Sequence, residues 1–587
     1  MTRMRKSWRS VLALLLCALS LSACTAGAAK KTETASRRDP FSRPALTEPE
    51  STETGTPRFD ELVYERPDLD ELDRLIAAAE EALRSDGGVE ACIEALDACY
   101  AFSDRYDTMY TLADIRNCQD QTDPYFAAEL KWCAENDSQL DRRMDALYYA
   151  CAASAYAAQL EESYFWEGFT EQYGDESESV YSDRYVELLR QESALIAEYR
   201  ALSADPTIEY RGSERSVYEL METLDGEAYN DAVRAYYRKY NEDFADLYIR
   251  LMAVREQMAG ELGYESYEQM QYRYGFDRDY TPGQAERYLE DIRIWIVPLY
   301  RELKERGIYD EVWENRIDGD FLLELIGTAA QDFGGSVEEA FAFMTGYGYY
   351  DVRVDRRKAD MSFQCYLKEP EAPFLFLDAE GYTPDILNLA HEFGHYCEAY
   401  VNENAYESVD LAEVYSQAME YLILTRLGEL LYDEDVENIA RTKMLDTVDL
   451  YVEQSAYAQF EHEVYALGSE RLDAGTLNAV ARRTAEQYGF YDADYDEFYS
   501  MSWIGITHFF EYPFYVVSYP VSNDAAMQLF EMERAEEGRG TDRYLSVLER
   551  DFGSLSGLID AGGLQSPFAP GRVQAIAALI RAVCLEE

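Results

Sequence analysis

The feature that most constrains the structure of this part of the chain is the short stretch His391-Glu392-Phe393-Gly394-His395. Its two histidines are four residues apart, so in an α-helix they lie one turn apart on the same face. In that arrangement two imidazoles can bind one divalent ion, usually zinc, while Glu392 reaches a water at the metal. We therefore predict a metal-binding helix here.

The residues before the motif favour a helix start. Thr383 can cap the helix, Pro384 suits its first position, and Asp385 places a negative charge in its first turn. An apolar stripe at helical spacing follows, formed by Ile386, Leu389 and Phe393.

Composition argues against a chance occurrence of the motif. The chain has 587 residues and only 4 histidines, and two of them are in this motif. Gly394 also needs a reason, because glycine inside a helix costs roughly 1 kcal/mol relative to alanine. We expect another backbone segment to approach the helix closely at Gly394.

A zinc site for hydrolysis needs a third protein ligand and an open position for water. The downstream carboxylates are Glu398, Glu403, Glu407, Glu413 and Glu420. Glu398 follows His395 on the same helix and points along that helix rather than across the ion. Glu403 and Glu407 fall in a polar turn.

Residues 411–420 have the pattern of a second helix, and Glu413 and Glu420 share one of its faces. We predict that Glu413 is the third ligand. Glu420 is then placed to orient a ligating histidine.

These residues resemble the thimet oligopeptidase and oligoendopeptidase F family of zinc metallopeptidases. The matching residues are Gly381, Thr383, Asp385, the motif from His391 to His395, Glu413, Glu420, His508, Pro513, Phe514, Tyr515 and Tyr519. The resemblance implies a mostly α-helical ellipsoid with a deep substrate channel. It also implies one Zn²⁺ per chain and endopeptidase action on short peptides. From the residues themselves we expect one large body with two subdomains and a small β-sheet beside the motif helix.

A cluster near the C-terminus contains His508, Tyr512, Tyr515 and Tyr519. Neutral donors of this kind near a zinc site can bind the developing oxyanion of a tetrahedral intermediate. The resemblance implies this role for His508, Tyr515 and Tyr519, and Tyr512 is a further candidate. His462 has no metal-ligand spacing to the other histidines, and we expect it to be structural.

The chain begins with a processing signal. Basic residues precede the apolar run Val11–Leu21, which is too short for an ordinary membrane-spanning helix. Small residues before Cys24 resemble a bacterial lipobox, which implies cleavage before Cys24 and lipidation of its thiol. We therefore expect a signal peptide over 1–23, a flexible tether over 24–58, and an extracytoplasmic, membrane-anchored lipoprotein.

The remainder of the chain has no second tether-like segment. We expect an N-terminal helical region over 59–205 and a catalytic region over 206–587. Residues 346–378 contain short alternating runs typical of a small sheet, including a strand near Pro373–Asp378. By the resemblance, the edge of this strand between Phe374 and Leu377 would pair with the backbone of a substrate peptide.

The formal net charge of −61 argues against nucleic-acid binding. So acidic a chain gains little attraction to an anionic bilayer, so a lipid on Cys24 would have to anchor it. The partners we expect are oligopeptide substrates and the membrane, with the protein itself a monomer.

Two alternatives stay open. A helical zinc carboxypeptidase would share the H-E-x-x-H motif and a helical channel, but would not need the tyrosine cluster. A non-catalytic peptide-binding lipoprotein is the other alternative, and the intact Glu392 and ligand set argue against it.

Overall fold

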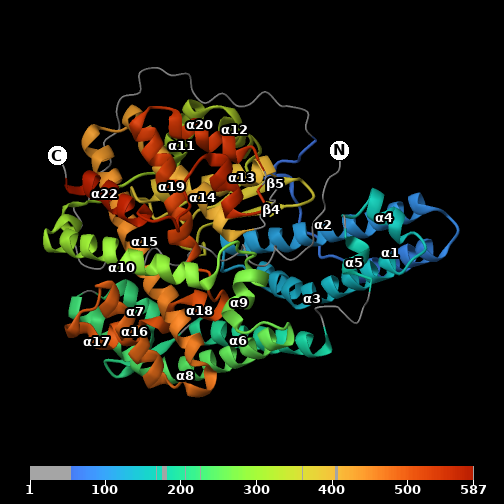
Figure 1. The fold of residues 1–587 in the computed structure, drawn as a ribbon, viewed down its shortest axis with the longest axis horizontal. Helices are drawn as coiled ribbons and strands as arrows, with labels where there is room; N and C mark the ends of the chain where they lie inside the picture. The colour runs from blue at the N-terminus through green and yellow to red at the C-terminus, as the bar shows by residue number, and fades with distance from the viewer. Residues whose placement is uncertain are drawn as a thin grey trace.

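The computed structural model describes residues 55–585 except 167, 175–181, 205, 225, 360, 403–407 and 551. Cys24, the signal peptide and most of the tether therefore lie outside the described residues, as do Glu403 and Glu407. The fold is mostly helical with two small sheets, which confirms the predicted class (Figure 1).

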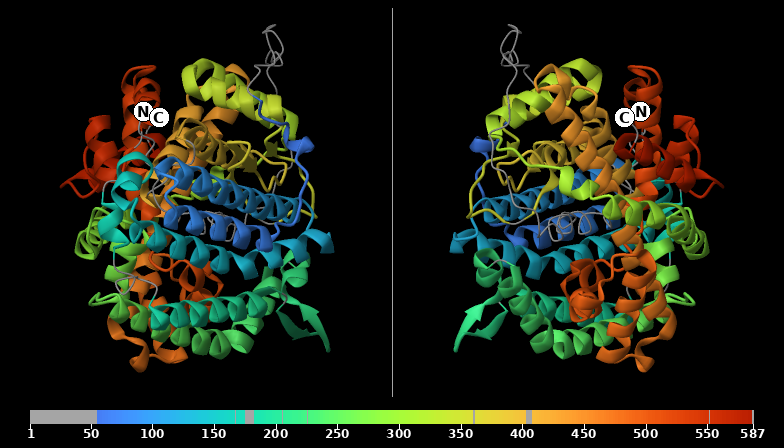
Figure 2. Two further views of the ribbon diagram at one scale, coloured as in Figure 1. Left: turned by 90° about the vertical axis from the view of Figure 1, so that its right-hand side faces the viewer. Right: turned by 90° about the vertical axis from the view of Figure 1, so that its left-hand side faces the viewer.

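Five N-terminal helices form an arm with a core of its own, on the right of Figure 1. They are α1 (Leu69–Arg84), α2 (Val89–Gln119), α3 (Pro124–Ala152), α4 (Ala157–Ser163) and α5 (Phe169–Gln172). Asp68 caps α1 by accepting a hydrogen bond from the Asp70 N–H at 3.1 Å. The C-terminal part of α2 leaves this core, and Leu112 and Ile115 pack into the main core instead. In the side view the arm crosses between the upper and lower helices (Figure 2).

The lower part of the molecule combines segments from the middle and the end of the chain (Figure 1). It contains α6 (Asp183–Ala204), β1 (Thr207–Tyr210), β2 (Ser213–Ser216), α7 (Val217–Thr223), α8 (Gly226–Glu261), α9 (Tyr267–Met270), α16 (Ala474–Tyr488), α17 (Asp496–Met501) and α18 (Thr507–Glu511). Helix α6 lies before the expected boundary at residue 205, yet it packs against α8 in the main core. The division into regions at 205 stays a prediction.

The upper part carries the H-E-x-x-H helix. Its helices are α10 (Pro282–Glu305), α11 (Gly319–Phe333), α12 (Gly335–Tyr347), α13 (Asp385–Asn402), α14 (Val409–Leu424), α15 (Asp433–Leu467), α19 (Ser518–Ala535), α20 (Arg539–Leu548), α21 (Leu555–Gly562) and α22 (Arg572–Leu585). Short 3₁₀ and π turns connect the elements at Phe59–Glu61, Gln271–Gly275, Ile308–Glu311, Leu427–Glu429, Ser469–Arg471, Ala493–Tyr495 and Ser502–Gly505.

A three-stranded sheet packs beside α13, as predicted. Its strands β3 (Tyr350–Asp351), β4 (Phe363–Leu367) and β5 (Ala372–Phe376) lie in the order β3-β5-β4. Strand β5 is therefore the central strand, antiparallel to β4 and parallel to β3.

The expected pairing of a substrate along residues 374–377 is wrong, because neighbouring strands already use this backbone. The Leu375 N–H donates to the Tyr349 carbonyl at 3.1 Å, and the Leu377 N–H donates to the Asp351 carbonyl at 2.9 Å. A run of apolar residues predicts a buried strand but not its place in the sheet.

The start of α13 also differs from the expectation. The helix begins at Asp385, and the Thr383 hydroxyl accepts a hydrogen bond from the Asn315 N–H at 3.2 Å instead of capping the helix. The Asp385 carboxylate accepts from the backbone N–H groups of Glu380, Gly381 and Tyr382. It thereby fixes the loop that leads into the helix.

Within the described residues, none of the helices has the length and apolar character needed to cross a membrane.

Candidate metal centre

Helices α13 and α14 approach each other closely at Gly394. A Cβ atom at this position would lie 2.6 Å from Ser416 Cα and 2.6 Å from the Tyr415 carbonyl oxygen. Real Cβ atoms do not approach backbone so closely, so only glycine permits this spacing. The expected close approach is present, and it brings the carboxylates of α14 next to the histidines of α13.

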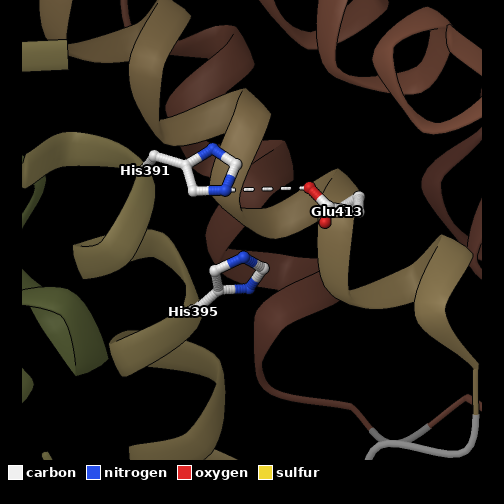
Figure 3. A group of neighbouring side chains, drawn as sticks. All are labelled: His391, His395 and Glu413. Atoms are coloured by element: carbon white, nitrogen blue, oxygen red, sulfur yellow. Dashed lines mark ion pairs between the residues drawn. The ribbon is translucent and has the colours of Figure 1, made fainter. Parts of the chain in front are cut away.

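His391, His395 and Glu413 converge on one point (Figure 3). One ligand atom from each lies within 4.8 Å of the others, and His391 Nε2 lies 3.7 Å from Glu413 Oε2. Two imidazole nitrogens and one carboxylate oxygen are the ligand types that zinc takes in hydrolytic enzymes. The donor set and its convergence therefore fit one divalent ion, and three protein ligands would leave a fourth position for water.

Burial and neighbouring charges set the protonation of the centre. Burial favours the neutral form of His391, but the hydrogen bond to Glu420 and three nearby carboxylates outweigh it and raise the His391 pKa to about 9. Burial and the nearby His391 lower the pKa of His395. Glu392 is buried beside them, and burial raises its pKa to about 7. A carboxyl group with a pKa near neutrality suits proton transfer.

Glu420, predicted to orient a ligating histidine because it shares a helix face with Glu413, contacts Nδ1 of His391. His391 Nδ1 and Glu420 Oε1 are 2.9 Å apart, which leaves Nε2 directed toward Glu413. Lys443 of α15 forms an ion pair with the other oxygen of Glu420. Burial raises the pKa of Glu420, but Lys443 and His391 outweigh it and hold that pKa below its ordinary value.

Tyr515 contacts the predicted third ligand, Glu413, directly. Its hydroxyl donates a hydrogen bond to Glu413 Oε1 at 3.1 Å. Phe514, just before it, adopts a left-handed backbone conformation with φ 67°, and its N–H donates to Glu461 Oε1 at 2.9 Å. This turn aims Tyr515 at the metal centre.

His508 and Tyr519 lie against Tyr515. The Tyr519 hydroxyl is 3.4 Å from His508 Nε2, and the ring centres of Tyr515 and Tyr519 are 5.3 Å apart. Burial lowers the pKa of His508 to about 4, so its imidazole is neutral at physiological pH. Tyr512 is half-buried just after α18, and its N–H donates a hydrogen bond to the His508 carbonyl at 2.8 Å.

Two other sequence candidates lie elsewhere. Glu398 is on α13, where its carboxylate accepts a hydrogen bond from the Asn402 amide at 3.2 Å. His462 lies between two carboxylates, with Nδ1 3.1 Å from Glu268 and Nε2 2.7 Å from Glu286. His462 is not part of the convergent group of metal ligands.

Sequence reasoning missed Lys443 and Gln417. The Gln417 amide lies 3.5 Å from Glu413 Oε2, and Lys443 supports Glu420. The sequence holds one weak signal for Lys443. It lies four residues after Ile439 and four before Thr447, which are both buried, so a charged residue falls on a buried face.

Comparisons with family models matched two parts of the chain. Residues 59–171 match the peptidase M3 N-terminal domain, and residues 336–554 match peptidase family M3. A search of curated protein sequences found no match.

Several solved structures share the fold. An oligoendopeptidase F structure solved at 3.1 Å is 24% identical with a TM-score of 0.73, covering 90% of this chain and 98% of its own. PZ peptidase A, solved with an inhibitor, is 23% identical with a TM-score of 0.73 over 90% of this chain and 99% of its own. An oligoendopeptidase F from Bacillus anthracis is 22% identical with a TM-score of 0.71, covering 90% of this chain and 98% of its own. An M32 carboxypeptidase from Deinococcus radiodurans is more distant, at 13% identity and a TM-score of 0.51 over 88% and 99%.

The family matches and the convergent His-His-Glu group with its adjacent Glu392 define a metallo-oligopeptidase. The two family matches together span more than half of the sequence. The chain belongs to peptidase family M3.

Proposed function

We propose that this protein is a zinc-dependent endopeptidase that hydrolyses short, unstructured oligopeptides outside the cytoplasm. The observation that carries the proposal is the convergence of His391, His395 and Glu413 within 4.8 Å, with Glu392 in the same helix turn. His391 and His395 would hold the ion through imidazole nitrogens and Glu413 through a carboxylate oxygen.

The residues of the chain divide the chemistry among them. Zinc, when bound, would lower the pKa of a water and polarise the scissile carbonyl. Glu392 takes a proton from the attacking water as its oxygen bonds to the carbonyl carbon. Glu392 then delivers that proton to the amine nitrogen as the C–N bond breaks.

The remaining polar residues orient the proposed metal ligands or stabilise the oxyanion. Glu420 keeps the Nδ1 proton of His391 in place, so that Nε2 offers its lone pair. Tyr515 holds one oxygen of Glu413, which orients the other toward the histidines. His508 and Tyr519 are neutral donors that would stabilise the oxyanion.

One experiment tests the proposal directly. The purified chain should contain about one zinc ion, and it should cut internally quenched peptides at internal bonds identified by mass spectrometry. His391→Ala should lose both metal and activity. Metal-free wild-type protein that cuts equally well would contradict the proposal.

The M32 carboxypeptidase shares this fold at low identity, so exopeptidase action is the second candidate. The products of the same quenched peptides distinguish endopeptidase from carboxypeptidase action. Release of single residues from the C-terminus would indicate a carboxypeptidase, and paired internal fragments would indicate an endopeptidase.

Substrate size follows from the channel that the family resemblance implies. A narrow channel admits an extended peptide but excludes a folded domain, because opening the domain would cost several kcal/mol. At about 3.3 Å per residue we expect substrates of roughly 5 to 20 residues. A length series of quenched peptides beside a stable folded protein tests this, and efficient digestion of the folded protein would contradict it.

The location rests on the sequence before the described residues. A basic start, an apolar run and Leu21-Ser22-Ala23-Cys24 support export and lipidation at Cys24. The protein would then act at the outer face of a bacterial membrane, held by lipid.

A further inference from the structure

Lys443 is a buried cation that contacts Glu420, and Glu420 in turn contacts the proposed metal ligand His391. Lys443 is on α15, and its side chain is 5% exposed. Its ammonium group forms an ion pair with Glu420 of α14, whose side chain is 11% exposed. It also lies 4.7 Å from the ring centre of Tyr421, which restricts its position. The contact thus joins α15 to the helix that carries Glu413.

Glu420 divides its two oxygens between two partners. Oε1 lies 2.9 Å from His391 Nδ1, and Oε2 pairs with Lys443. Because a carboxylate is rigid and planar, fixing Oε2 also fixes the direction in which Oε1 meets the imidazole. A histidine that binds a metal is neutral, so Lys443 is then the charge that compensates Glu420.

A second set of contacts joins α15 to Glu413. The Tyr421 hydroxyl lies 2.6 Å from the Thr447 hydroxyl and donates to the Asn523 amide oxygen at 3.1 Å. Asn523 donates to Gln417 at 2.7 Å, and Gln417 lies 3.5 Å from Glu413. Glu413 and Glu420 are therefore both connected to the helix that carries Lys443.

We propose that Lys443 is a positioning residue for the metal centre, which raises zinc affinity by holding Glu420 against His391. The inference rests on the proposed zinc-dependent function. If the ion pair were purely structural, its loss would lower the free energy of unfolding and leave zinc affinity unchanged.

The test measures zinc affinity by chelator competition on the metal-depleted full chain. Removing a group behind a metal ligand typically weakens affinity by about 10- to 100-fold. We expect Lys443→Met to weaken zinc binding by about tenfold at the lower end of that range. Lys443→Arg, which keeps the charge, should stay within about threefold of the wild type.

A double-mutant cycle identifies the route. If Lys443 acts through Glu420, the pair Lys443→Met with Glu420→Gln should bind zinc no more weakly than Glu420→Gln alone. The visible spectrum of the Co²⁺-substituted chain should shift in Lys443→Met and return in Lys443→Arg. This spectrum reports ligand geometry independently of activity.

Lys358→Met is the matched control. Lys358 is also a buried lysine, 3.1 Å from the buried carboxylate of Asp351, and it supports the sheet. Its loss should lower stability while zinc affinity remains at the wild-type value. Circular dichroism checks folding, and Lys443→Gln replaces Lys443→Met if the latter does not fold.

The outcomes are distinguishable. Wild-type zinc affinity and an unshifted Co²⁺ spectrum in the Lys443 variants would overturn this inference alone, as would additive effects in the cycle. A wild-type chain that binds no zinc would overturn the proposed function and this inference with it.

Discussion

Gly394 of α13 lies directly against Ser416 of α14, so close that a Cβ on Gly394 would be 2.6 Å from Ser416 Cα. This contact sets the separation of the two helices that supply His391 and Glu413. Because Gly394 has no Cβ, the two helices can pack this closely, and the geometry of the candidate metal centre depends on that packing.

Gly394→Ala should destabilise the protein by about 1–3 kcal/mol and weaken zinc binding, because backbone must move to admit the methyl group. Thermal unfolding and zinc titration measure the two effects. Gly260→Ala is the control, since a Cβ there meets nothing within 4 Å and helix propensity favours alanine by up to about 1 kcal/mol. Equal behaviour of the two variants would contradict the packing argument.

Glu392→Gln should retain zinc but lose about 10²- to 10⁴-fold in turnover, because the amide cannot take a proton from water. Elemental analysis and peptide hydrolysis rates measure this in the same preparation. Near-normal turnover would remove Glu392 from the proposed mechanism.

Replacing Tyr515 and replacing Tyr519 should have different effects. Tyr519→Phe should lower kcat more than it raises KM, because its hydroxyl would act on the oxyanion. Tyr515→Phe removes the bond to Glu413 and should also weaken zinc affinity several-fold. If only KM changed in Tyr519→Phe, Tyr519 would be a substrate-binding residue.

His462 should stabilise the fold in a pH-dependent way. Its hydrogen bond to Glu268 raises its pKa above the ordinary 6.5, against the opposing effect of burial. The contribution is then complete below about pH 6.5 and is lost as pH rises through the raised value. The unfolding free energy of wild type should exceed that of His462→Gln by about 1 kcal/mol at pH 6, and the gap should shrink by pH 9. A gap that grows with pH would contradict this sign.

Cys24→Ala should release the protein from the membrane fraction or stall its processing, because the lipid is the proposed anchor. Immunoblots of membrane and soluble fractions measure this. Replacing another cysteine, such as Cys584, should leave the distribution unchanged. Unaltered attachment of Cys24→Ala would indicate an uncleaved signal helix or a protein partner.

Local patterns in the sequence were enough to predict the helix with His391 and His395, the second helix with Glu413 and Glu420, and the close approach at Gly394. They succeed because residues three, four and seven apart share a helix face whatever the rest of the fold does. Contacts between segments that are distant in the sequence leave no regular residue spacing from which they could be predicted. The bond from Tyr515 to Glu413 joins residues 102 apart, and Lys443 meets Glu420 across 23 residues. The central place of β5 and the packing of α6 likewise depend on how whole elements pack. Only tertiary structure decides these contacts, because helix crossing and strand order are set by the shape of the entire core.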